Sequence, residues 1–104
     1  MTINEMQSVV EEWANQFTKP YFSPLSRMAA LTEEVGELAR VMNRIYGDKP
    51  NKSEENLKDL EEEIGDILFS LICNANAEGV DLEKSFKRKI DKVYNRDNNR
   101  FDKK

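Results

Sequence analysis

The sequence predicts an all-α fold, a four-helix bundle in which an antiparallel hairpin of two helices carries an acidic site. Apolar residues recur at spacings of three and four along most of the chain, which is the period of an amphipathic helix. Prolines and glycines fall where such helices would begin or end. With 104 residues, 35% of them charged, and a mean hydropathy of -0.76, the chain has room for one small domain. We expect this domain to span residues 1–96 and a polar C-terminal tail to span 97–104.

The first helix is marked at its start by Thr2 and Glu5, which form a capping-box pattern. We expect this helix to end near Lys19, because Pro20 follows. Its apolar residues are Ile3, Met6, Val10, Trp13 and Phe17. Of these, we expect Phe17 to pack in the core.

The second helix is predicted to be long. Ser23 and Pro24 supply an N-cap followed by a proline at the first helical position, and Gly47 supplies the stop. Between them an apolar stripe continues at helical spacing through Leu25, Met28, Leu31, Val35, Leu38, Met42 and Ile45. We expect this stripe to face the core.

Two further helices follow a loop with the composition GDKPNKS. Ser53 is the expected N-cap of the third helix, which should stop at Gly79, and Asp81 is the expected N-cap of the fourth. The apolar residues of the third helix are Leu57, Leu60, Ile64, Ile67, Leu68, Leu71 and Ala75, and those of the fourth are Leu82, Phe86, Ile90 and Val93.

The stretch ILFSLICNANA in the third helix is apolar on nearly every side. One neighbouring helix cannot bury such a surface, so we expect a second contact surface and therefore a homodimer or homotetramer. The alternative is a core built wholly within one chain, which a chain of this size makes harder to achieve.

Composition excludes several kinds of site. The chain has no histidine and a single cysteine, Cys73, which rules out a disulfide framework, a Cys/His zinc site and a Ser/His/Asp triad. The N-terminus is too polar for a signal peptide, and no apolar run approaches the roughly 18 residues that span a bilayer. We therefore expect a cytoplasmic protein without membrane contact. The net charge of -4 argues against general affinity for nucleic acid.

Two acidic pairs border the apolar stripes of the second and third helices. Glu34 and Glu37 are one helical turn apart, and so are Glu63 and Asp66. Glu37 and Glu63 lie equally far from Pro50 in the predicted loop, and the same holds for Glu34 and Asp66. An antiparallel hairpin centred on this loop would bring all four carboxylates into one patch.

Such a patch needs neutralisation. At roughly 5 Å and an effective dielectric of about 20, each pair of like charges costs about 3 kcal/mol. Protonation, basic side chains or a divalent cation would remove this cost, and four oxygen ligands without nitrogen or sulfur favour Mg²⁺ or Mn²⁺. The alternative is that both pairs lie on solvated helix faces and bind nothing.

Basic residues are concentrated near the C-terminus, where Lys89, Lys92, Arg96 and Arg100 fall within one arc of a helix. Cations at a helix C-terminus also complement the macrodipole, so each of them can have a purely structural role. Together with an oxygen-bound metal, however, such a stripe suits a polyphosphate, because the metal bridges phosphate oxygens and the basic groups take the remaining charge.

Three motifs, EEVGE at 33–37, EEIGD at 62–66 and KVYNRD at 92–97, together resemble the MazG-like nucleoside triphosphate pyrophosphohydrolases in their short, single-domain form. The resemblance implies an all-α bundle that forms dimers or larger oligomers. It also implies hydrolysis of a (deoxy)nucleoside triphosphate to monophosphate and pyrophosphate.

The resemblance further implies roles for individual residues. The Mg²⁺ ligands would be Glu34, Glu37, Glu63 and Asp66. Lys92 and Arg96 match the basic pair of the family that approaches the phosphates, and Asp97 and Arg100 belong to the same C-terminal motif.

Our hypothesis for the reaction is attack of a water molecule on the α-phosphorus, with Mg²⁺ lowering the pKa of the water and stabilising the charge on departing pyrophosphate. Glu33 would orient or deprotonate the water, although it could equally be a surface acid. Trp13 and Tyr21, each with an apolar body and a polar tip, are candidates for the edge of a pocket that receives the base.

Two other functions stay open at this point. One is a pyrophosphatase that prefers dUTP or dCTP. The other is a non-catalytic helical dimerisation module that binds nucleic acid through the residues from Lys89 to Arg100. The second function leaves the two matching acidic pairs without a purpose, so we expect a nucleoside triphosphate as substrate and no nucleic-acid partner.

Overall fold

The computed structural model describes residues 1–48 and 56–104. Within these ranges the protein consists of four α-helices and one π-helical turn, without a strand, which confirms the predicted all-α fold. The elements are α1 (Ile3–Ala14), α2 (Pro24–Tyr46), α3 (Leu57–Glu78), α4 (Leu82–Lys92) and the π-helical turn η1 (Val93–Asp97).

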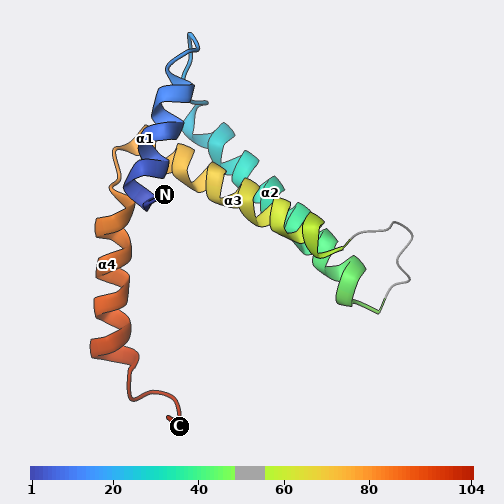
Figure 1. Cartoon of the computed structure of the whole chain (residues 1–104), viewed down its shortest axis with the longest axis vertical. Helices are drawn as coiled ribbons and strands as arrows, with labels where there is room; N and C mark the ends of the chain where they lie inside the picture. Colours follow the sequence, from blue (N-terminus) through green and yellow to red (C-terminus); the bar gives the residue numbers. More distant parts are fainter. Residues whose placement is uncertain (49–55) are drawn as a thin grey trace.

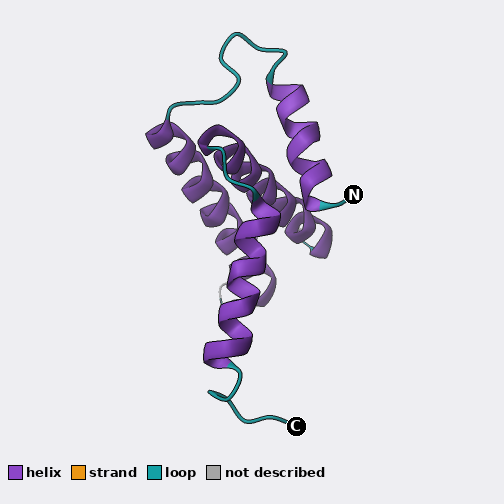
Figure 2. Ribbon diagram, turned by 90° about the vertical axis from the view of Figure 1, so that its left-hand side faces the viewer, coloured by secondary structure: helices purple, strands orange, loops and turns teal. Residues whose placement is uncertain are grey.

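The long helices α2 and α3 lie side by side and run in opposite directions, forming the predicted antiparallel hairpin (Figure 1). Helix α1 crosses the end of the hairpin where α2 begins and α3 ends, and it packs on α3. Helix α4 packs on α1 and then projects away from the hairpin, so that the C-terminus lies far from the other helices (Figure 2).

Helix α1 begins as the sequence predicts. The N–H group of Glu5 donates to the hydroxyl of Thr2 at 3.1 Å, and the N–H group of Thr2 donates to the Glu5 carboxylate at 3.2 Å. The predicted end near Lys19 is wrong, because the helix ends at Ala14. The N–H group of Phe17 bonds to the carbonyl of Ala14 at 3.1 Å, a spacing of three residues that replaces the α-helical spacing of four. This tighter turn leads the chain out of the helix and toward α2.

Helix α2 begins at Pro24 and ends before Gly47, both as predicted. Ser23 occupies the N-cap position, but its hydroxyl donates to the hydroxyl of Ser26 at 3.1 Å and makes no capping bond to the backbone. The start of α2 is therefore set by the proline rather than by a side-chain cap.

Helix α3 has Asn56 as its N-cap, whose side chain accepts from the N–H group of Lys58 at 2.9 Å. Ser53, for which the sequence predicted the capping role, and Pro50, the predicted centre of the hairpin, lie outside the described residues. The helix ends at Gly79, where φ is 70°. This left-handed conformation is readily adopted by glycine, which explains the stop that the sequence indicated. Helix α4 begins with Asp81 as its N-cap, also as predicted.

The buried apolar core is small and lies where α1 meets the hairpin and between the hairpin helices; it comprises Val10, Ala14, Val41, Ile72 and Ala75. The prediction that the whole apolar stripe of α2 faces the core is partly wrong, because Met28, Val35 and Met42 are about half exposed. The side of α2 turned toward α3 instead carries Arg27, Leu31, Glu34, Leu38 and Val41. The apolar residues of α2 therefore cover two faces, and α3 buries only one of them.

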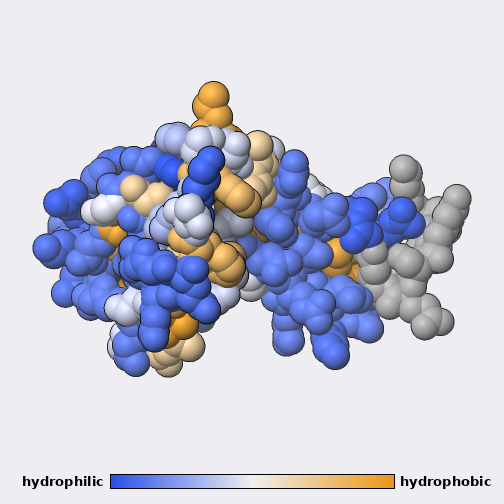
Figure 3. All heavy atoms as spheres, turned by 90° about the horizontal axis from the view of Figure 1, so that it is seen from above, coloured by the Kyte–Doolittle hydropathy of each residue, from blue (hydrophilic) through white to orange (hydrophobic). Residues whose placement is uncertain are grey.

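The surface seen from above is mostly hydrophilic, with apolar residues gathered in separate patches (Figure 3). Among the described helices, none combines the length and the apolar character that crossing a bilayer requires.

Candidate active site

An acidic group lies between the two helices of the hairpin. Glu34 of α2 and Glu63 and Asp66 of α3 each contribute one carboxylate oxygen, and these three oxygens lie within 4.8 Å of one another. Glu34 and Glu63 are half-buried and Asp66 is exposed. Three of the four carboxylates that the sequence predicted to meet therefore do so. We call these three residues the acidic group.

Glu63 is the least satisfied member of the acidic group. Its Oε2 atom is buried and has no hydrogen-bond partner among residues 1–48 and 56–104. Burial raises the pKa of the Glu63 carboxyl above its ordinary value, and the charges of Asp66, Glu34 and Glu37 raise it further, whereas Arg40 acts in the opposite direction. A buried carboxylate oxygen without a donor is costly, so this geometry favours a positively charged ligand.

Two further acids named by the sequence lie outside the acidic group. Glu37 is exposed and accepts from Arg40, with 3.1 Å between its Oε2 atom and both Nε and Nη2 of the guanidinium. Its carboxylate still acts electrostatically on Glu63. Glu33 is exposed on α2 and precedes the first member of the group in the sequence.

An aromatic pocket of about 430 Å³ lies next to the acidic group, at the α1 end of the hairpin. The ring of Trp13 packs edge-on against two other aromatic rings of the pocket. Its centroid lies 5.0 Å from that of Phe17 and 5.7 Å from that of Phe69. The residues that line the pocket are Trp13, Phe17, Lys19, Pro20, Tyr21, Phe22, Arg27, Ala30, Phe69, Ser70, Cys73 and Asn74. We call this space the aromatic pocket. Phe17, expected in the core, is half exposed and forms part of its wall instead.

Both hairpin helices connect the aromatic pocket to the acidic group. Ala30 precedes Glu34 by four residues in α2, and Ser70 follows Asp66 by four residues in α3. At about 1.5 Å per residue, the pocket and the acidic group are roughly 6 Å apart along the hairpin. A single ligand with a flat aromatic end and an anionic end, paired with a cation, would fit both.

Tyr21 contributes its ring rather than its hydroxyl to the aromatic pocket. The hydroxyl donates to the carboxylate of Glu11 and accepts from Nδ2 of Asn76 at 3.2 Å. Burial raises the pKa of Tyr21 to about 12, and the hydrogen bond to Glu11 acts in the same direction. The sequence predicted Tyr21 as a candidate for the edge of a base pocket. Tyr21 does line the pocket, but its hydroxyl is already hydrogen-bonded within the chain.

The basic residues do not meet the acidic group within one chain. Lys92 ends α4, and Arg96 lies in the π-helical turn, on the part of the chain that projects away from the hairpin (Figure 1). Arg96 donates through Nε and Nη2 to the two carboxylate oxygens of Asp97, at 3.0 and 3.1 Å, and Arg100 donates to the same carboxylate at 3.4 Å. The hydrogen bond from Arg96 lowers the pKa of Asp97.

The sequence of this chain matches known proteins over most of its length. The family described as the MazG nucleotide pyrophosphohydrolase domain matches residues 22–101. The chain belongs to this family. This confirms the resemblance drawn from the three motifs, and the matched residues include the whole hairpin that holds the acidic group.

The chain is also similar to individual proteins and to solved structures over most of its length. The uncharacterized protein YpjD of Bacillus subtilis (strain 168) is 48% identical over 103 residues, which cover 99% of this chain and 93% of the relative. The crystal structure of YPJD from Bacillus subtilis covers 88% of this chain and 94% of its own, at 49% identity and a TM-score of 0.83. The crystal structure of the Bacillus-conserved MazG protein, a nucleotide pyrophosphohydrolase, covers 92% of this chain and 93% of its own, at 43% identity and a TM-score of 0.81.

The sequence analysis did not identify Arg27 as a site residue. Arg27 lines the aromatic pocket and is only 8% exposed. A signal was present in the sequence, because Arg27 shares one helical face with Leu31, Glu34 and Leu38. A charged residue in line with an apolar stripe and an acid of the site is a candidate for a buried role.

Proposed function

We propose that this MazG protein hydrolyses (deoxy)nucleoside triphosphates to nucleoside monophosphate and pyrophosphate, in a reaction that depends on Mg²⁺ or Mn²⁺. The observation that carries the proposal is the acidic group with its unpartnered Oε2 atom of Glu63, placed about one helical turn from the aromatic pocket. A nucleoside triphosphate has a flat base for the pocket and a polyphosphate that binds a divalent cation.

The donor set suits the proposed ion. Three carboxylate oxygens within 4.8 Å of one another are hard ligands, which Mg²⁺ and Mn²⁺ prefer. A cation at this position would also give the buried Oε2 atom of Glu63 a ligand to bind, since this atom accepts no hydrogen bond from the described residues. Glu37, the fourth predicted ligand, would have to exchange its contact with Arg40 to join the group. When bound, Mg²⁺ supplies positive charge that stabilises the departing pyrophosphate and makes water more acidic.

The side chains have separate tasks in this reaction. The rings of Trp13, Phe17 and Phe69 would hold the base by stacking, since the pocket offers mainly apolar surface. A water molecule attacks the α-phosphorus, and the bond from this phosphorus to the bridging oxygen of pyrophosphate breaks. Glu33, which stays exposed beside the acidic group, is proposed as the base that accepts the proton of the water.

We also propose that the active form is a homodimer or homotetramer. One side of α2 exposes Met28, Val35 and Met42, which are 56%, 49% and 46% exposed. Such a row of large apolar side chains favours burial against another subunit. A second copy would also allow Lys92 and Arg96 to reach the phosphates, which lie beyond their reach in a single chain whose α4 projects away from the hairpin.

Product analysis tests the proposed function. Purified protein is incubated with each nucleoside triphosphate and deoxynucleoside triphosphate, with Mg²⁺ or with EDTA, alongside the variant Glu63→Gln. We expect monophosphate and pyrophosphate to form only with the metal and to be lost in the variant. A panel of bases also separates broad hydrolysis from a preference for dUTP or dCTP. If no nucleotide is cleaved with either metal, the catalytic proposal is wrong and a non-catalytic helical module is the better account.

A further inference from the structure

Two of the walls of the aromatic pocket belong to different parts of the chain. One wall is the segment between α1 and α2, from Lys19 to Phe22. The other wall is the face of α3 that includes Phe69, Ser70 and Asn74. The segment between the helices has no regular secondary structure, so its distance from α3 must be fixed by side chains.

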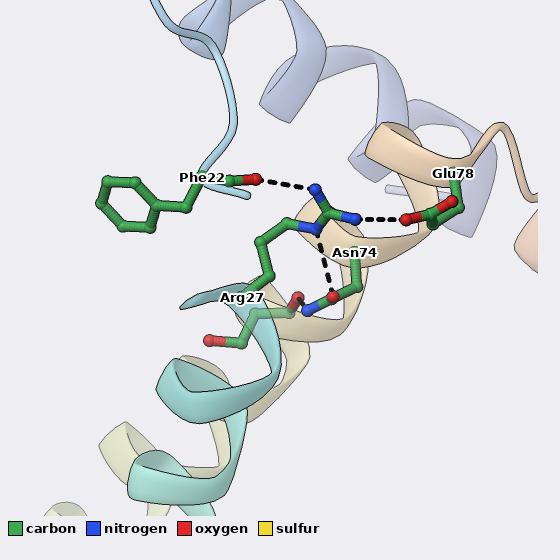
Figure 4. A network of polar contacts seen from close by, with 5 residues as sticks. Phe22, Arg27, Asn74 and Glu78 are labelled. Atoms are coloured by element: carbon green, nitrogen blue, oxygen red, sulfur yellow. Dashed lines mark hydrogen bonds and ion pairs between the residues drawn. The ribbon is translucent and has the colours of Figure 1, made fainter. Parts of the chain in front are cut away.

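Arg27 joins the two walls (Figure 4). Its Nη1 atom donates to the carbonyl of Phe22 at 2.7 Å, and its Nε atom donates to Oδ1 of Asn74 at 3.3 Å. Its Nη2 atom forms an ion pair with Glu78, which lies one turn further along α3. Every nitrogen of the guanidinium therefore has a partner, and two of the three partners line the pocket.

This arrangement fixes Asn74 as well. While Oδ1 of Asn74 accepts from Arg27, its Nδ2 atom donates to the carbonyl of Ser70 at 2.9 Å. Both ends of the amide are thus engaged inside the chain. Asn74 therefore contributes a fixed surface to the pocket, and its orientation depends on Arg27.

Burying a guanidinium group costs free energy, because its charge is removed from water. The side chain of Arg27 is 9% exposed, and an apolar residue of similar size would avoid the cost of removing a charge from water. The planar fork of arginine, however, can hold three acceptors in fixed directions at once, which neither an apolar residue nor lysine can do. The choice of residue therefore points to geometry rather than to stability.

We propose that Arg27 is a positioning residue that fixes the width of the aromatic pocket and thereby sets the affinity for the nucleoside part of the substrate. This inference rests on the proposed function, because it takes the pocket as the site of the base. Arg27 acts through the Phe22 backbone and the Asn74 side chain, and it is not a member of the acidic group.

Steady-state kinetics of Arg27→Lys test the proposal, because lysine keeps the charge opposite Glu78 but loses the fork. We expect KM for a nucleoside triphosphate to rise about 10-fold and kcat to stay within about 2-fold of the wild-type value. The reason is that the variant loses binding of the nucleoside, which is equal in the ground state and the transition state, and keeps the contacts made only in the transition state. Inorganic tripolyphosphate, which has no nucleoside, should inhibit the variant as strongly as the wild type. Arg88→Lys, at an exposed position of α4, is the matched control and should change neither constant.

A second variant guards against a folding defect. Glu78→Ala removes one acceptor from the fork at a side chain that is 57% exposed, and it should raise KM in the same direction by a smaller factor. Glu78→Gln keeps an acceptor oxygen and should restore the KM of the wild type. A uniform loss of kcat with unchanged KM in all three variants would overturn the proposal, because it would indicate only a smaller folded fraction.

Binding without turnover separates this proposal from the proposed function. Trp13 is the only tryptophan of the chain and lies in the pocket, so its fluorescence reports binding of a nucleoside monophosphate. We expect Arg27→Lys to weaken this binding about 10-fold, in proportion to the change in KM. Equal affinity in wild type and variant would overturn the role of Arg27. Hydrolysis that is absent although the monophosphate binds would instead overturn the proposed function alone.

Discussion

Two neighbouring regions of this protein treat their polar groups in opposite ways. In the acidic group, three carboxylates lie together and the buried Oε2 atom of Glu63 accepts no hydrogen bond from the described part of the chain. At the α1 end of the same hairpin, the hydroxyl of Tyr21 and every guanidinium nitrogen of Arg27 have partners within the chain. The first region is built from like charges and the second from complementary pairs.

The difference separates a binding region from a supporting one. Buried polar groups without partners cost free energy, so a protein keeps them where a ligand will satisfy them. A network in which every group is paired has nothing left to offer a ligand and instead fixes the positions of the elements that it joins. The predictions below test this contrast, in order of decreasing expected effect.

Removing one carboxylate from the acidic group should have the largest effect. For Glu34→Gln we expect activity to fall about 100-fold or more, which corresponds to about 3 kcal/mol of transition-state stabilisation. Without metal, the same variant should melt at a higher temperature than the wild type, because one source of repulsion is gone. Turnover and thermal melting measure the two effects, and Glu61→Gln, at an exposed position of α3, is the control. A variant that loses both activity and stability would contradict the contrast.

Adding Mg²⁺ should stabilise the folded state. At a concentration of about 100 times Kd, linkage contributes about 2.7 kcal/mol. For a chain of this size this corresponds to a rise in melting temperature of roughly 10 °C. We expect Glu34→Gln to lose this rise and Arg27→Lys to keep it. Thermal melting with and without Mg²⁺ checks the prediction, and an equal rise in a variant without the acidic group would show that the ion binds elsewhere.

Removing the Tyr21 hydroxyl from its hydrogen-bond network should have a smaller effect, on the free energy of unfolding. Tyr21→Phe leaves Glu11 and Asn76 without the hydroxyl between them, so we expect a loss of about 1–2 kcal/mol, measured by denaturant unfolding. Tyr46→Phe, at a position that is 63% exposed, should be neutral. If the two variants are equally stable, the network does not support the fold.

The same hydroxyl predicts a dependence on alkaline pH. Because the pKa of Tyr21 is raised from 10.0 to about 12 in the folded protein, the folded state holds the phenolic proton more tightly than the unfolded state. The resulting stability is fully present below pH 10 and is lost as the pH rises toward 12. Tyr21→Phe should lack this loss, which denaturant unfolding between pH 9 and pH 12 would detect.

The smallest expected effect concerns Gly36, in the middle of α2. A Cβ atom at this position would meet nothing within 4 Å in the described chain. Gly36→Ala should therefore stabilise a single chain by about 0.5–1 kcal/mol, because alanine is the better helix former. Gly47→Ala is the opposite control, since its Cβ atom would clash with the carbonyl oxygen of Asn43. A loss of stability in Gly36→Ala would show that another subunit approaches this side of the helix.

Much of the fold follows from local signals in the sequence. The capping box at Thr2, the proline at Pro24 and the left-handed stop at Gly79 act over a few residues, and all three are found in the structure. The end of α1 was not predictable in this way, because no helix breaker stands at Ala14 and the chain leaves the helix by a change in hydrogen-bond spacing. The boundary after residue 96 stays a prediction.

The candidate site was predictable only in part. The spacing of the acids in two antiparallel helices predicts that they meet, and three of them do. Glu37 and Arg40 are three residues apart on one helix, so their spacing allows an ion pair. Spacing alone does not decide whether Glu37 turns toward Arg40 or toward the other acids, because this depends on the surroundings of the side chain. The aromatic pocket depends in the same way on how the segment after α1 returns to α3.

The sequence by itself determined the helices, the hairpin, the membership of the MazG family and the identity of the acids, because these depend on residue types at short or repeated spacing. Only the tertiary structure decided which face of α2 is buried, that Arg27 joins two walls of the pocket, and that α4 and η1 carry Lys92 and Arg96 away from the acidic group. The physical reason is that a helical period gives the direction of each side chain around its own axis, whereas the partner of each face is set by how the helices cross.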